Sequence, residues 1–193
     1  MNLLLTSDNA NPPQKYIDNR DVFQTGDLVL YRGTSILSKG IQYFDNAYYN
    51  HIGVVIRLEE FDRNLTLDMW AQGLAFSPLS RRISGYKDFC ILRPKVSEQK
   101  ATEAIRSIMQ SWDGRDIEYD KLLLLRVAII KKTGIDFTGL GDKSKFICSE
   151  LAQYYCHLLN LTVYDEHNLI TPQDFLRYVD ENFIVLLNDA PTK

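Results

Sequence analysis

Cys148 is the residue best placed to do chemistry, because it lies where an apolar stretch meets a long amphipathic helix, in Phe146-Ile147-Cys148-Ser149-Glu150-Leu151. A helix N-terminus stabilises a thiolate relative to a thiol. The residues three, four, seven and eleven positions further on place the thiol on the stripe that packs inward: Leu151, Ala152, Tyr155 and Leu159. A nucleophilic cysteine in that position needs a base that faces it from another element.

His51 is the histidine that suits this role. His157 lies nine residues after Cys148 on the same predicted helix, about two and a half turns, which places it on the opposite face. His167 lies in a charged loop. His51 begins a predicted strand and shares one face with Gly53, while the other face is apolar: Ile52, Val54 and Ile56.

The glycine next to His51 on that face suggests how the thiol could reach the imidazole. If the apolar face fills the main core, Gly53 leaves room for a helix end to approach the sheet closely, and we expect the tip of the cysteine helix there. The alternative is that His51 is a core or edge histidine whose polar atoms are satisfied locally.

A third residue should orient the imidazole and stabilise its protonated form. Asp68 is the only carboxylate in the predicted strand from Leu65 to Gln72, and it is our choice, with Gln72 as the second candidate. The alternative for Asp68 is a solvent-facing position on an edge strand.

A free cysteine is most often a small buried hydrophobic residue, and this is the alternative for Cys148. We assign Cys90 and Cys156 to that class. Tyr31 and Trp70 are candidates to line a substrate cleft, although aromatic core residues are commoner. No metal or cofactor is indicated.

The composition suits one globular domain. The chain has 193 residues, 45% of them hydrophobic and 24% charged, and we divide it into an N-terminal arm, 1–25, and a single domain, 26–193. The net charge of −3 and the absence of a basic stripe argue against nucleic acid as a partner. Without a signal peptide or a transmembrane stretch, and with three cysteines that suit free thiols, we expect a cytoplasmic protein; its oligomeric state is not indicated.

Strand patterns dominate the first half of the chain and helical patterns the second half. Strands are predicted at 26–33, 51–58, 65–72, 74–79, 89–93 and 183–187, and helices at 35–44, 98–112, 119–131, 148–159 and from Thr171. This order predicts an α+β fold, with a small antiparallel sheet or barrel covered by helices.

Six segments in order resemble a known family, the circularly permuted papain-like cysteine hydrolases of the NlpC superfamily, YiiX-like branch. The resemblance covers most of the chain from Gly26 to about Leu176. Its segments are Gly26-Asp27-Leu28-Val29, Asn50-His51-Ile52-Gly53-Val54-Val55, Gly73-Leu74 with Pro78-Leu79, Gly114 with Tyr119-Asp120, Phe146-Ile147-Cys148-Ser149-Glu150-Leu151, and Ile170-Thr171-Pro172-Gln173-Asp174-Phe175.

The resemblance implies a permuted papain-like fold with His51 as general base and Cys148 as nucleophile at a helix N-terminus, and no metal or cofactor. The family's third residue is usually a glutamate before a small residue on the third strand, whereas this chain has Asp68 in a shifted position. The implied activity is a thiol-dependent hydrolase that cleaves an amide bond, in a peptide or an N-acyl amino acid, or an ester bond. Two alternatives remain: a lipid acyltransferase or lipase that uses the same dyad, and a non-catalytic module that binds a peptide or acyl group.

Overall fold

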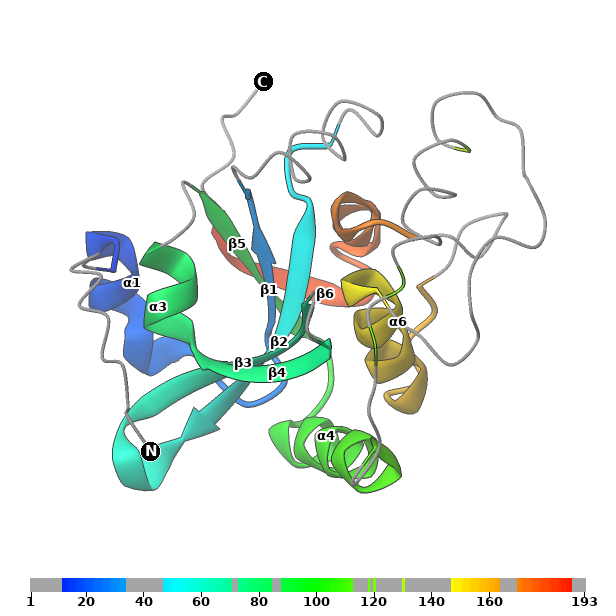
Figure 1. The fold of residues 1–193 in the computed structure, drawn as a ribbon, viewed down its shortest axis with the longest axis horizontal. Coiled ribbons are helices and arrows are strands. Elements are labelled where there is room, and N and C mark those ends of the chain that lie inside the picture. Colours follow the sequence, from blue (N-terminus) through cyan, green and yellow to red (C-terminus); the bar gives the residue numbers. More distant parts are fainter. Residues whose placement is uncertain are drawn as a thin grey trace.

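The fold is built on one open antiparallel sheet of six strands, in the order β4-β3-β2-β1-β5-β6 (Figure 1). The computed structural model describes residues 12–33, 47–70, 73–84, 88–112, 118, 120, 130, 147–163 and 170–188. The strands are β1 (Leu28–Tyr31), β2 (His51–Leu58), β3 (Arg63–Trp70), β4 (Gly73–Pro78), β5 (Phe89–Pro94) and β6 (Phe183–Asn188).

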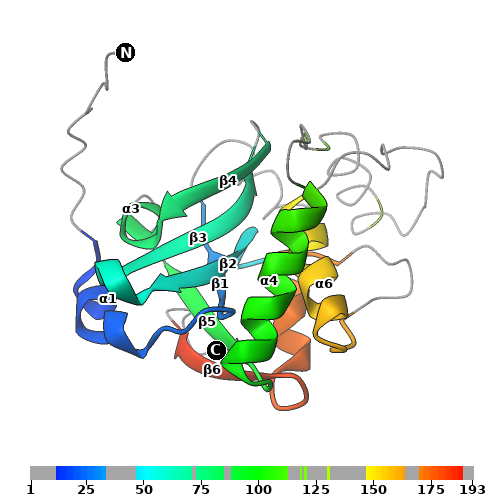
Figure 2. The same cartoon turned by 90° about the horizontal axis from the view of Figure 1, so that it is seen from below.

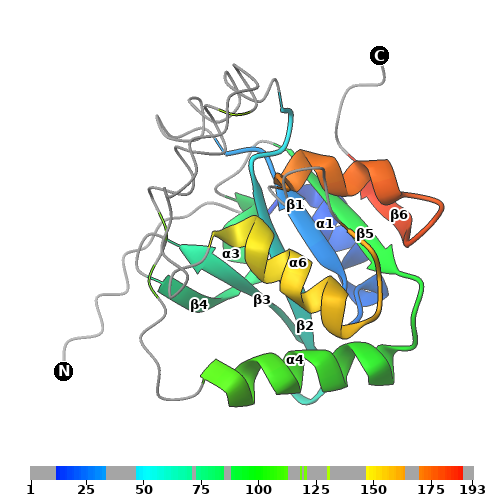
Figure 3. The same ribbon diagram turned by 90° about the vertical axis from the view of Figure 1, so that its right-hand side faces the viewer.

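Helices cover both faces of this sheet. One face packs against α4 (Glu98–Trp112) and α6 (Cys148–Leu158), and the other against α1 (Gln14–Asn19) and α3 (Leu79–Ser84). The two layers are visible on either side of the sheet in Figure 2, and Figure 3 shows α6 lying across the strands. Three short 3-10 helices complete the described part of the chain: η1 (Arg20–Val22), η2 (Glu59–Phe61) and η3 (Pro172–Tyr178).

The composition of strand β1 explains why both faces of the sheet must be covered by helices. All four of its residues are fully buried, and they alternate between two separate cores. Leu28 and Leu30 lie in the core beneath α6, whereas Val29 and Tyr31 lie in the core beneath α1 and α3. A continuous apolar strand of this kind is stable only in the middle of a sheet that is covered on both sides.

The helix starts follow from their capping residues. Ser97 accepts the Lys100 N–H on its hydroxyl oxygen, at 3.3 Å, before α4 begins. Glu150 accepts the Ile147 N–H at 3.0 Å and so closes the first turn of α6. The Asp174 carboxylate accepts hydrogen bonds from both the backbone N–H and the side-chain hydroxyl of Thr171. The segment that follows is a 3-10 helix, at the place where the sequence predicts a helix.

The predicted α+β class with an antiparallel sheet is confirmed, and the sheet is open, not a barrel. The expectation of a simple N-terminal arm over 1–25 needs correction for its second half, since residues 14–22 form α1 and η1. Tyr16 and Phe23 are buried against the sheet, so tertiary packing orders this segment. The predicted helices at 35–44 and, apart from residues 120 and 130, at 119–131 lie outside the described residues.

Gly26 generates a prediction about stability. Its φ is +101°, and a Cβ at this position would lie 2.4 Å from the Cβ of Ala101 and 2.4 Å from the hydroxyl oxygen of Tyr155. We therefore expect Gly26→Ala to lower the free energy of unfolding by about 2–4 kcal/mol, measured by urea denaturation. Tyr155→Phe, which removes only the hydrogen bond from the Tyr155 hydroxyl to the Gly26 carbonyl, should cost about 1 kcal/mol. A loss below about 0.5 kcal/mol for Gly26→Ala would contradict this account.

Candidate active site

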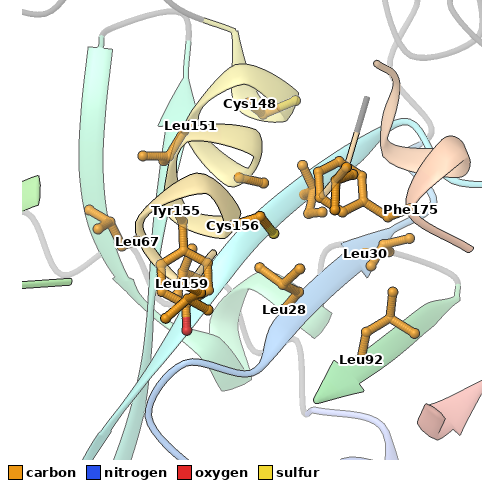
Figure 4. Packing of buried hydrophobic residues seen from close by; sticks show 14 of the residues in the cluster. Leu28, Leu30, Leu67, Leu92, Cys148, Leu151, Tyr155, Cys156, Leu159 and Phe175 are labelled. Carbon is orange, nitrogen blue, oxygen red and sulfur yellow. The ribbon is translucent and has the colours of Figure 1, made fainter. Parts of the chain in front are cut away.

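Cys148 is the first residue of α6 and is almost fully buried, with 4% of its surface exposed. Its side chain lies at the tip of the helix, above the apolar residues that hold α6 on the sheet (Figure 4). The preceding residue, Ile147, has an extended backbone, so the chain enters the helix at Cys148 itself. The thiol is thus at the positive end of the helix dipole and turned into the protein.

His51 begins β2 and is held between two aromatic rings. Its ring stacks on Tyr31, its partner on β1, with centroids 5.6 Å apart, and it packs against Trp70 of β3 at 4.4 Å. Only 12% of the His51 side chain is exposed. Aromatic packing on two sides restricts the ring, which is what a general base with a fixed orientation requires.

Asp68 lies beside His51 on the same face of the sheet. It pairs with Gly53 across the β2–β3 ladder, and its Oδ2 atom is 3.5 Å from Nε2 of His51. This distance is an ion-pair contact, and neither atom has a hydrogen bond within the described structure. The Asp68 side chain is fully buried, so the solvent-facing alternative for this residue is wrong.

Gly53 makes room for the acid, not for the helix that we expected there. A Cβ on Gly53 would lie 2.5 Å from Oγ1 of Thr66 and 3.0 Å from Cβ of Asp68. The body of α6 packs on the opposite face, with Ile52 and Val54. Since His51 begins the strand, the helix tip meets it at the strand end, where the charge of Cys148 acts on the imidazole.

Two further residues surround Asp68. Trp70 donates its indole N–H to Oδ1 of Asp68 at 2.6 Å. Arg82 of α3 places its Nε atom 3.9 Å from Oδ2 and its guanidinium 4.0 Å above the Trp70 ring. Sequence reasoning missed Arg82, because the pattern at 74–79 predicts a strand and gives no sign of the helix that begins at Leu79. The apolar pair Leu79 and Ile83, four residues apart, is the signal that could have found this helix.

The candidate substrate residues have contacts that differ from those we expected. Tyr31 is fully buried beneath His51 and therefore does not line a cleft in this structure. Trp70 is partly exposed, and its contacts include His51, Asp68 and Arg82. Gln72, the second candidate for the third role, lies outside the described residues.

The charges around His51 favour the imidazolium. Burial alone would lower the pKa of His51, but the charge of Cys148, the next largest influence, and contact with Asp68 outweigh burial and raise this pKa to about 9. The cysteine and the aspartate therefore act on the ring in the same direction, from two different elements.

The carboxyl group of the helix cap is also perturbed. Burial raises the pKa of Glu150 to about 7, against the effect of the hydrogen bond from Ile147 N–H and with a further contribution from the nearby Asp120. The second cysteine of α6 behaves differently from the first, since complete burial raises the pKa of Cys156. This supports its assignment as a small core residue.

The comparisons with known proteins establish the fold alone. No protein-family model matches the sequence, and no curated protein is similar to it at a significant level. Among solved structures, the chain is similar to the crystal structure of metalloprotein yiiX from Escherichia coli O157:H7, DUF1105. The two are 14% identical with a TM-score of 0.59, over 87% of this chain and 98% of that chain. The fold is therefore YiiX-like.

Because yiiX is described as a metalloprotein, we tested whether this chain offers metal ligands. Among the described residues, no three His, Cys, Asp or Glu side chains lie together in a way that could hold a metal ion. The acid beside His51 is also matched by the cationic Arg82. The donor set of the described residues does not fit a metal ion. In the described part of the chain, no helix is both long and apolar enough to cross a membrane.

The contact between Cys148 and His51 generates a prediction. Because the charge of Cys148 contributes most to stabilising the imidazolium, Cys148→Ser should lower the pKa of His51 by about one unit or more. The measurement is an NMR titration of the imidazole resonances, in which a His51→Gln variant identifies the signal among the three histidines. An unchanged titration in Cys148→Ser would mean that the thiol and the imidazole are not electrostatically coupled.

Proposed function

We propose that this chain is a thiol-dependent hydrolase of the permuted papain-like type, which cleaves an amide or ester bond through an acyl-enzyme on Cys148. The observation that carries the proposal is the meeting of a helix-tip cysteine with a histidine whose Nε2 atom faces a buried carboxylate. Nucleophile, base and orienting acid come from three different elements, α6, β2 and β3.

The first half of the proposed reaction forms the acyl-enzyme. Since Nε2 of His51 faces Asp68, the other ring nitrogen, Nδ1, takes the proton from Cys148. The thiolate attacks the substrate carbonyl carbon and forms a C–S bond. The imidazolium then gives its proton to the leaving amine or alcohol as the C–N or C–O bond breaks.

The second half regenerates the enzyme. Nδ1 of His51 accepts a proton from water, which attacks the thioester carbonyl, and the acid leaves as the C–S bond breaks and the thiol regains its proton. In both halves the developing oxyanion would be stabilised by the Cys148 backbone N–H, in the first turn of α6, with one further donor not assigned.

Asp68 takes the third role in this proposal. Its buried carboxylate favours the imidazole tautomer with a proton on Nε2 and stabilises the imidazolium. The Trp70 indole N–H, bound to the other carboxylate oxygen, fixes the orientation of the acid. Asp68 thus takes the place of the glutamate that is usual in the family that this sequence resembles.

Two features of the sequence support the permuted papain-like assignment. His51 precedes Cys148 in the chain, the order expected for a permuted arrangement, and the sequence motifs resemble the family. A thiolate–imidazolium pair is suited to acyl transfer to water from peptides, N-acyl amino acids or esters.

The proposal predicts which thiol reacts first. Cys148 should be alkylated fastest near neutral pH, because it lies at a helix N-terminus and interacts with His51, whereas Cys90 and Cys156 are fully buried. Limited alkylation by iodoacetamide followed by peptide mass mapping measures this order. Earlier labelling of Cys90 or Cys156 in the folded protein would remove the basis for the nucleophile.

Variants at the three site residues test the activity itself. In a screen of peptide, N-acyl amino acid and ester substrates, Cys148→Ser should abolish turnover and His51→Gln should reduce kcat/KM by about 100-fold or more. His51→Gln is preferable to alanine, because the ring packs against Tyr31 and Trp70 and its truncation would leave a gap.

Asp68→Asn should also lower kcat, because the amide cannot stabilise the imidazolium and favours the wrong tautomer. Gln72→Ala is its comparison variant and should keep activity. If Asp68→Asn is as active as the unmodified protein while Gln72→Ala is inactive, the third role belongs to Gln72. Turnover that survives Cys148→Ser would refute the proposed function as a whole.

A further inference from the structure

Arg82 contacts the group that orients His51, although it does not belong to the catalytic set proposed above. It projects from α3, which covers the face of the sheet opposite α6 (Figure 2). Its Nε atom is 3.9 Å from Oδ2 of Asp68, and one terminal nitrogen donates to the Ser77 hydroxyl at 2.6 Å. Only 24% of the Arg82 side chain is exposed.

The same carboxylate oxygen therefore faces two cationic groups. Oδ2 of Asp68 is 3.5 Å from Nε2 of His51 and 3.9 Å from Nε of Arg82, and none of these three atoms has a hydrogen bond within the described structure. The carboxylate lies between two partners without a short bond to either. Its other oxygen is held by Trp70 at 2.6 Å, so it cannot rotate freely toward one of them.

The Trp70 ring connects the two cations a second time. Its centroid is 4.4 Å from that of the His51 ring, and the Arg82 guanidinium carbon is 4.0 Å from it. The face of an indole ring attracts a guanidinium and an imidazolium alike, so Trp70 can interact with both Arg82 and His51. Because Nε2 and Nε contact the same oxygen, they are at most 7.4 Å apart, the sum of the two contact distances.

We propose that Arg82 is a positioning residue that shares the Asp68 carboxylate with His51 and so limits how strongly this acid stabilises the imidazolium. The inference deepens the proposed function, on which it rests for its catalytic meaning. An imidazolium paired with Asp68 alone would hold its proton more tightly and would be a poorer acid toward the leaving group. Arg82 would thus favour proton release while keeping the acid in place.

The other groups that face His51 do not supply the same effect. Among the described residues, Tyr31 faces it from β1, Asp68 from β3 and Cys148 from α6. Of these, Asp68 and Cys148 favour the protonated ring. Arg82 is the cationic group of the described residues that opposes them through Asp68.

The test is an NMR titration of His51 in Arg82→Gln, made in the Cys148→Ser background so that the thiolate does not contribute. Removing a positive charge at most 7.4 Å away should raise the pKa of His51 by about one unit or more, for an effective dielectric constant of roughly 20 to 40. Arg81→Gln is the matched control, since Arg81 is the exposed neighbour on α3 and its loss changes the net charge equally. It should leave the titration within about 0.2 units.

Two further variants keep the result interpretable. Arg82→Lys retains the charge and should leave the pKa of His51 close to that with arginine. Arg82→Met, whose apolar chain keeps contact with Trp70, serves if Arg82→Gln does not fold, and it should show the same rise. A pKa that is unchanged or lowered in the folded Gln or Met variant, or an equal rise in Arg81→Gln, would overturn the inference.

The titration needs no substrate, so its outcome is separate from that of the proposed function. If the protein also turns over a substrate, Arg82→Gln with Cys148 intact should shift the alkaline limb of the kcat/KM profile upward by about the same amount. If Arg82 had only a structural role, Arg82→Gln would lower the thermal stability and leave the alkaline limb of the kcat/KM profile unchanged. A pKa rise without any catalytic activity would support the shared carboxylate and refute the hydrolase.

Discussion

The buried carboxylate of Asp68 is the constraint on which the rest of the site depends. Its side chain is fully buried in the middle of a β-sheet, where an unpaired charge costs roughly several kcal/mol. Each neighbour contributes to offsetting that cost: an indole N–H from Trp70, an imidazole from His51 and a guanidinium from Arg82. The buried charge of Asp68 therefore requires hydrogen-bond donors and cationic groups around it.

This requirement also explains local features of the sheet. Asp68 sits opposite Gly53, where a Cβ would come within 3.0 Å of the aspartate side chain, so the ladder accommodates the acid only because that position is a glycine. Trp70 follows two residues later on the same face, beside His51. The helix α3 then returns over this face and brings Arg82 to the far side of the carboxylate.

Much of this arrangement could be predicted from local pattern. Strand β2 and helix α4 have the predicted bounds, because a run of β-branched residues in one and a wide apolar stripe in the other leave little ambiguity. Asp68 could be chosen because it is the only acid on its strand. What could not be predicted depends on tertiary contacts: the face on which α6 packs, the six-residue helices α1 and α3, and therefore Arg82, which reaches the site only through α3.

The proposed chemistry adds a pattern that extends across the sheet. In the thiolate–imidazolium form, the charges alternate from α6 to α3: Cys148 negative, His51 positive, Asp68 negative and Arg82 positive. Each buried charge then has an opposite charge beside it, and the four cancel, which avoids the cost of a net charge in the interior. Without Arg82, the thiolate of Cys148, the imidazolium of His51 and the carboxylate of Asp68 would together carry one uncompensated negative charge. The arginine on the far face therefore offsets the second negative charge, that of Asp68, which the histidine alone would leave uncompensated.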